Sequence, residues 1–283
     1  MRNDRPSATA YRVAMRRAAH QILDDPLVFD DPIALRIVGG GAEAAIRSDL
    51  RRYQSSLGRS LRLFLVARSR CAEDALATAV TGGVGQYVVL GAGLDTFAYR
   101  NPYPVESFRV FEVDFPSTQA WKHKLLADAG IPVPASVTFV PIDFETQTLP
   151  ERLQACGFRA DAPAWFSWLG VSMYLTREAV LSTLAFVARR APGSGITFDY
   201  LVPPASLPFV KRMAFYWFAR RLAAAGEPWQ TWFDPDELAR ELRALGFERL
   251  EDLGADVLNT RFFAGRADRL GGRSVGRVMT ATC

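Results

Sequence analysis

Residues 86–114, QYVVLGAGLDTFAYRNPYPVESFRVFEVD, decide the fold. The stretch opens with an apolar run at 87–90, which is typical of a strand buried on both faces. The run breaks at a glycine turn that consists of Gly91, Ala92 and Gly93. Glycine directly after a buried strand lets a ligand approach the backbone without meeting a Cβ atom. The turn is therefore a candidate ligand-binding loop, although a simple strand-to-helix turn would have the same sequence.

A second apolar run at 108–113 follows the turn and carries two acids, Glu112 and Asp114. An acid at the tip of the neighbouring strand can accept hydrogen bonds from two ribose hydroxyls. The glycine turn and the acids together predict a nucleoside site.

The third glycine of a dinucleotide fingerprint is missing. That fingerprint needs glycine or alanine three residues after the second glycine, so that helix and strand pack closely around a pyrophosphate. Here the position is Thr96. A G-x-G turn with an acid 21 residues after Gly93 suits S-adenosylmethionine, which has ribose hydroxyls but no phosphate. An NAD(P)-dependent oxidoreductase is the alternative enzyme class.

The rest of the chain alternates between strand and helix patterns. Strand patterns at 137–142, 163–170 and 195–201 are separated by helical segments with short turns, which predicts an α/β fold with a doubly wound, mostly parallel sheet. Residues 247–253 and 261–266 are expected to form a closing antiparallel pair. The sequence predicts three parts: a helical cap at residues 1–80, the cofactor-binding domain at 81–270, and a flexible tail at 271–283. It also predicts a helical insertion at 202–233 within the cofactor-binding domain.

Composition narrows the class of protein. The 283 residues are 49% hydrophobic and include three scattered cysteines and two histidines, which predicts a soluble, cytoplasmic protein without a disulfide framework or a metal site. No apolar run reaches membrane-spanning length, and no basic stripe with interleaved aromatics favours nucleic acid. Residues 1–80 hold 13 arginines against 9 acids, which are interpreted mainly as solvated helix faces.

Several motifs in the same order resemble the leucine carboxyl methyltransferase family and its bacterial relatives. They are LGAGLDTFAYR with VFEVDFP, PIDFE at 141–145, SWLGVSMYLT at 167–176 and ITFDY at 196–200. The resemblance implies a seven-stranded class I methyltransferase fold and S-adenosyl-L-methionine as the cofactor. It implies that Arg68 holds the cofactor's carboxylate and that Asp143 and Phe144 flank the adenine. Leu169 stands where many relatives carry a glutamate, so the contact made by that acid is in doubt.

The acceptor side is expected at the carboxyl ends of the strands, where ligands of such sheets bind. The candidates on this side are Trp168, Tyr174, Tyr200 and Tyr216, and Tyr174 and His20 are the candidates for positioning the substrate. A packing role is the alternative for His20, and plain core is the alternative for the aromatic insertion.

The scarcity of histidines favours an acceptor that is already ionised at neutral pH. A carboxylate, which needs no general base, meets this condition, and its product is a methyl ester. The predicted function is O-methylation of a small-molecule acid. A phenol, a protein C-terminal carboxylate and a cofactor-binding protein without catalysis remain alternatives, and the expected partners are a small-molecule substrate and, at most, a second copy of the chain.

Overall fold

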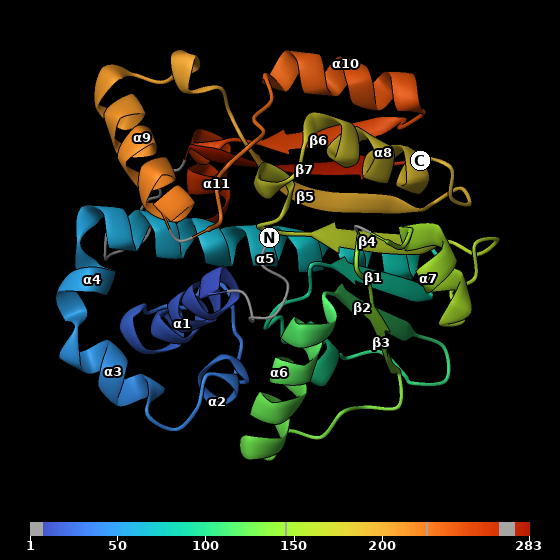
Figure 1. Ribbon diagram of the computed structural model, residues 1–283, viewed down its shortest axis with the longest axis horizontal. Helices are drawn as coiled ribbons and strands as arrows, with labels where there is room; N and C mark the ends of the chain where they lie inside the picture. The colour runs from blue at the N-terminus through green and yellow to red at the C-terminus, as the bar shows by residue number, and fades with distance from the viewer. Residues whose placement is uncertain (1–7, 145, 225, 266–274) are drawn as a thin grey trace.

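The computed structural model describes residues 8–144, 146–224, 226–265 and 275–283 (Figure 1). Its centre is a seven-stranded sheet in the order β3-β2-β1-β4-β5-β7-β6. β1 to β5 run parallel, and β7 runs antiparallel to both of its neighbours. The strands are β1 Gln86–Leu90, β2 Arg109–Asp114, β3 Val137–Pro141, β4 Ala164–Trp168, β5 Gly195–Leu201, β6 Arg249–Leu253 and β7 Gly276–Thr282. The predicted α/β fold with a mostly parallel, seven-stranded sheet is confirmed.

Helices make up most of residues 8–81. They are α1 Ala8–Leu23, α2 Ala34–Ile37, α3 Ala42–Ser48, α4 Leu50–Gln54 and α5 Ser56–Thr81. α5 is more than part of a cap, because it packs on the sheet: its Phe64 and Ala67 share a buried cluster with Val278 of β7. α1 and α2 form a separate buried cluster with Leu94, just after the glycine turn.

The remaining helical segments connect or flank the strands. They are η1 Phe97–Tyr99, α6 Pro116–Asp128, α7 Leu149–Ala155, η2 Ser172–Tyr174, α8 Arg177–Ala188, η3 Pro204–Ser206, α9 Phe209–Ala224, α10 Pro235–Leu245 and α11 Ala255–Phe262. Local sequence explains several boundaries. The Asp234 side chain accepts hydrogen bonds from the N–H groups of Asp236 and Glu237 at the start of α10, and Gly246 ends that helix in the left-handed region, with φ +110°.

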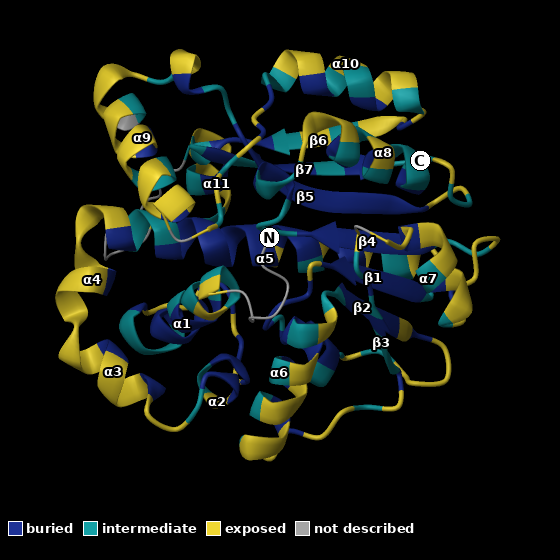
Figure 2. Cartoon of the chain, viewed as in Figure 1, coloured by how far each residue is buried: buried dark blue, intermediate teal, exposed yellow. Residues whose placement is uncertain are grey.

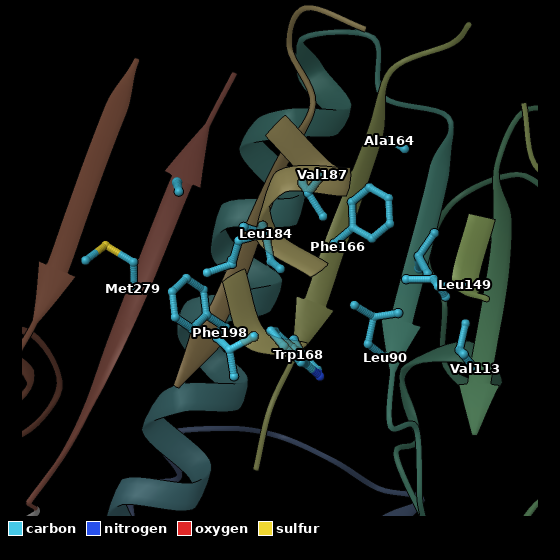
Figure 3. Close-up of a cluster of buried hydrophobic side chains, with 14 of the residues drawn as sticks. Leu90, Val113, Leu149, Ala164, Phe166, Trp168, Leu184, Val187, Phe198 and Met279 are labelled. Carbon is cyan, nitrogen blue, oxygen red and sulfur yellow. The ribbon is translucent and has the colours of Figure 1, made fainter. Parts of the chain in front are cut away.

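The largest core lies between the sheet and helices α7, α8 and α10. Leu90, Phe166, Trp168 and Phe198 project from the strands toward Leu184 of α8, as Figure 3 shows. Side chains alternate along a strand, so their neighbours in sequence point to the opposite face, where α5 packs. This alternation decides which residues at the strand ends can share a site.

Two expectations at the end of the chain are wrong. The predicted flexible tail contains β7, a strand hydrogen-bonded to β5 on one side and β6 on the other. β7, rather than residues 261–266, pairs with β6, and α11 occupies part of the latter segment. Among the described residues, no helix combines the length and apolar character needed to cross a bilayer.

Candidate functional site

The glycine turn has a backbone that only glycine adopts readily. Gly91 and Gly93 have φ values of +65° and +48°. A Cβ on Gly91 would lie 2.4 Å from the Val171 side chain, and one on Gly93 would lie 3.1 Å from Cβ of Ala10 in α1. The space beside these glycines is thus filled by the chain itself. Packing of the chain itself therefore requires glycine at both positions, and contact of the turn with a ligand stays a prediction.

Asp114 holds the turn in place from the carboxyl end of β2. Its Oδ2 accepts a hydrogen bond from the N–H of Gly93 at 2.5 Å, and its Oδ1 accepts one from the N–H of Phe115 at 2.7 Å. Burial raises the pKa of Asp114, and the two N–H donors oppose that rise. Because carboxylate oxygens have further lone pairs, Asp114 can also accept from hydroxyls of a ligand.

Glu112, the other predicted cofactor-binding acid, has partners inside the fold. Its Oε2 accepts from Lys122 Nζ of α6 at 2.7 Å and from the Tyr99 hydroxyl at 3.1 Å. Both members of the ion pair are almost fully buried. Glu112 thus ties α6 to the sheet, and Asp114 is the acid whose side chain contacts the glycine turn. A cofactor contact of Glu112 stays a prediction.

Arg68 of α5 reaches the carboxyl ends of β4 and β5. It is buried, and its Nη1 donates to Asp199 Oδ2 at 2.6 Å. Asp199 Oδ1 accepts from the N–H of Gly170 at 2.5 Å, and a Cβ on Gly170 would lie 2.8 Å from Arg68 Nη2. Nε of Arg68 is buried without a hydrogen-bond partner among the described residues. The guanidinium therefore keeps one unused donor at the end of β4.

Sequence reasoning missed Asp199. The signal was present, because an acid in the otherwise apolar strand ITFDYL is rarely buried unless it is paired. The neighbouring Tyr200, which the sequence predicts on the acceptor side, points to the opposite face. There its hydroxyl donates to Asp252 at 2.8 Å, so Tyr200 is not a substrate-side residue.

Three more predicted residues follow strand ends. Asp143 and the exposed Phe144 come after β3, and the half-buried Leu169 comes after β4. α7 begins farther along the chain, with Thr148 as its N-cap. Their contacts to the cofactor stay predictions.

Of the predicted acceptor-side aromatics, Tyr174 lies on η2, shortly after the end of β4. Burial is the main cause that raises the pKa of Tyr174, and interactions with Thr9 and Arg68 oppose the rise. Trp168 belongs to the core on the other face of the sheet, with its ring centroid 6.5 Å from that of Phe198. Tyr216 is 49% exposed on α9. Trp168 and Tyr216 are therefore corrected to a core and a surface position.

His20 has a packing role. The side chain is fully buried, and its Nδ1 lies 2.7 Å from Asp24 Oδ2. Its Nε2 accepts hydrogen bonds from the N–H groups of Val28 and Phe29. Both ring nitrogens are engaged within the cap, which rules out the predicted positioning role.

A buried polar network that sequence reasoning also missed ties α1 to the loop after the glycine turn. Arg17 Nη2 donates to Thr96 Oγ1 at 2.5 Å and to Asp31 Oδ2 at 2.6 Å, and Thr96 Oγ1 donates to Asp31 Oδ2 at 2.7 Å. Arg100, which follows Thr96 in the same loop, pairs with Glu73 of α5. Farther along α1 toward its N-terminus, Thr9 donates to Glu227 of the insertion. The network and the Thr9 contact hold α1 over the turn.

Other features of the described residues lie apart from this site. No cluster of His, Cys, Asp or Glu in the described ranges could hold a metal ion. A surface hollow of about 520 Å³ lies between residues 26–28, α5 and α11, and none of the predicted site residues lines it.

Comparison with known proteins identifies the family. The profile of the family "Leucine carboxyl methyltransferase" matches residues 10–188. The "Putative S-adenosyl-L-methionine-dependent methyltransferase YktD" of Bacillus subtilis is 33% identical over 291 residues, which cover 95% of each chain. A protein of Mycobacterium avium with the same descriptive name is 32% identical over 206 residues, 69% of this chain and 65% of the relative.

Two solved structures share the fold. A crystal structure titled as a putative methyltransferase from Thermobifida fusca has a TM-score of 0.56 at 19% identity, covering 99% of this chain and 95% of that one. A protein of the DUF574 family from Streptomyces avermitilis has a TM-score of 0.51 at 15% identity, covering 96% of each. The family match and the relatives show a cofactor of the S-adenosylmethionine type rather than a nicotinamide dinucleotide. The chain belongs to the leucine carboxyl methyltransferase family and is an S-adenosylmethionine-dependent methyltransferase.

Proposed function

We propose that this methyltransferase transfers the methyl group to a carboxylate oxygen of a small molecule and forms a methyl ester. The observation that carries the proposal is the position of the two histidines. His20 is buried and doubly bonded in the cap, and His123 lies against Phe139 of β3, with ring centroids 4.0 Å apart. Neither imidazole is available as a general base near Arg68 and Asp114. An acceptor that is already ionised needs no such base.

The residues present fit the cofactor. The unused Nε donor of the buried Arg68 suits a carboxylate group, and Asp114, at the end of β2, suits a pair of hydroxyls. β1 and β4 lie between β2 and β5 in the sheet, so these two groups flank the glycine turn from either side. Arg68, Asp114 and the turn of Gly91, Ala92 and Gly93 would therefore hold it, and Asp143 and Phe144 are proposed to adjoin its adenine.

The chemistry asks for alignment rather than proton transfer. When bound, S-adenosylmethionine supplies a sulfonium methyl group that an oxygen takes up in an in-line displacement. The chain's contribution is to orient the acceptor and exclude water. A tyrosine hydroxyl is protonated at neutral pH, and burial raises the pKa of Tyr174 further. Tyr174 can then donate a hydrogen bond to one acceptor oxygen while the other reacts.

The test uses a methyl-labelled cofactor with matched carboxylic acids and phenols. The proposal expects labelled products from the acids only, and mild alkali should release that label as volatile methanol, because esters hydrolyse and aryl ethers do not. Alkali-stable label on a phenol would overturn the carboxylate assignment. Label found in a polypeptide fraction would replace the small acid with a protein C-terminus. The rate should also stay nearly constant across neutral pH, since no base must be deprotonated.

A further inference from the structure

α9 exposes a row of large apolar side chains on the side turned away from the protein. The exposed fractions are 67% for Phe209, 78% for Val210, 53% for Met213, 49% for Tyr216 and 55% for Trp217. We call these residues the α9 outer face. Successive spacings of four, three and one residues place four of these side chains on one side of the helix, and they form a single stripe: Phe209, Met213, Tyr216 and Trp217. Figure 2 shows α9 at the margin of the molecule with much of its length exposed.

The opposite side of α9 is anchored. Phe215 and Leu222 are buried, and Phe215 shares a cluster with Met173 of η2 and Leu201 of β5. Substitutions on the outer face therefore leave these anchoring contacts in place. Because η2 also contains Tyr174, the anchored side of α9 lies next to the proposed acceptor site.

Arginines accompany the α9 outer face. The Arg212 guanidinium lies 5.8 Å from the ring centroid of Phe209, and that of Arg221 lies 5.6 Å from the ring of Trp217. Arg220 is also exposed. The helix sequence, FVKRMAFYWFARRLAA, contains no acidic residue. The surface is thus apolar and cationic at once.

Charge decides between the partners that could cover such a surface. A second copy of the chain, docked about a two-fold axis, would bring α9 arginines against α9 arginines, with no acid in the helix to balance them. A single-stranded nucleic acid could stack on Phe209 and Trp217 but would leave the aliphatic Val210 and Met213 without a partner. An anionic lipid surface offers its acyl chains to the apolar side chains of the α9 outer face. It offers its phosphate groups to the arginines.

We propose that the α9 outer face binds the surface of an anionic lipid membrane. α9 lies in the plane of the headgroups, with its apolar side chains inserted and Arg212, Arg220 and Arg221 against the lipid phosphates. This differs from the sequence-based expectation of no membrane partner, which considered spanning segments only. Peripheral binding needs an amphipathic surface and not a spanning helix.

The test is sedimentation of the full chain with two kinds of vesicle, phosphatidylcholine mixed with phosphatidylserine and phosphatidylcholine alone. We expect binding to the anionic vesicles and its loss at high salt. Arg220→Gln and Arg221→Gln should each weaken binding about fivefold. Trp217→Glu should weaken binding at least about tenfold, since it removes an interfacial aromatic and adds a charge that the lipids repel.

Matched controls come from other surfaces. Val105→Glu changes a side chain that is 46% exposed in the loop before β2, and Arg243→Gln removes an exposed arginine of α10. Both should bind like the wild type, and circular dichroism should show every variant folded. Absence of vesicle binding, or equal loss in Val105→Glu, would overturn the proposal. The proposal would also be overturned if the protein did not bind vesicles and instead formed a dimer, or bound an oligonucleotide, through the α9 outer face.

Discussion

The N–H of Gly93 donates a 2.5 Å hydrogen bond to the carboxylate of Asp114, 21 positions later in the chain. The contact joins the end of β1 to the end of its parallel neighbour β2. It places the carboxylate of Asp114 beside the left-handed backbone of the glycine turn. The first test of the site concerns this pair.

Asp114→Ala should weaken binding of the demethylated cofactor by about 1–3 kcal/mol, because charged hydrogen bonds to its ribose are lost. Isothermal titration calorimetry measures the change. Asp128→Ala is the matched control, since Asp128 pairs with Lys124 on the exposed surface of α6 and should matter little. Unchanged affinity in Asp114→Ala would reject the ribose assignment.

Arg68→Ala should both destabilise the fold and weaken cofactor binding. Removing Arg68 leaves the Asp199 carboxylate buried, with the Gly170 N–H as its one remaining side-chain hydrogen-bond partner among the described residues. Such losses cost about 3–5 kcal/mol. Urea unfolding and calorimetry measure the two effects. Arg70→Ala, two residues along the same helix, removes an exposed pair with Asp74 and should cost about 0–1 kcal/mol. Equal effects of the two substitutions would contradict the buried role of Arg68.

Gly91→Ala should destabilise the protein more than Gly83→Ala. Both residues have positive φ values, +65° and +96°, so both substitutions strain the backbone. Only the Gly91 variant also forces a Cβ to within 2.4 Å of Val171, whereas Gly83 has open space. The additional cost should be about 1–3 kcal/mol, and Val171→Ala in the same chain should recover part of it. Thermal unfolding that ranks the two variants equally would refute the contact.

Asp31→Asn should lower the free energy of unfolding near neutral pH and should change it little in acid. Burial opposes ionisation of Asp31, but Arg17 and Arg100, together with hydrogen bonds from Thr96 and Arg17, outweigh it and lower the pKa of this carboxyl. A lowered folded-state pKa stabilises the protein above the ordinary value of about 3.9, and this contribution disappears as pH falls through the folded value. Denaturation of both proteins at about pH 7 and below about pH 3 measures the difference. The exposed Asp161→Asn is the control, and a difference that did not shrink in acid would disprove the assignment.

The sequence predicted the parallel half of the sheet well because each of its strands is a compact apolar run. β1 and β5 lie within one residue of the expected segments. β7 was missed because its sequence, GRVMTAT, is only partly apolar. Its pairing with two distant strands, rather than its own composition, makes it a strand.

The sequence identifies candidate site residues where a position along a strand or a family motif marks them. Position after a strand made Asp114 a candidate, and the structure places its carboxylate against the glycine turn. The family resemblance pointed to Arg68. The partners were not predictable in the same way, since Arg68 meets Asp199 across 131 positions and Arg17 meets Thr96 across 79. Side-chain direction separates Asp199 from Tyr200, and the alternation along β5 becomes informative only once the covering helices are known.

The position of β7 has a consequence during synthesis on the ribosome. β6 has β7 as its sole neighbour in the sheet, and β7 is made after every other described strand. Until residues 276–282 leave the exit tunnel, the nascent chain holds β5 with an unpaired edge and β6 with none of its backbone partners. Such a half-finished sheet is open to pairing with other chains, so translation that stops shortly before β7 should yield aggregates rather than a shortened enzyme.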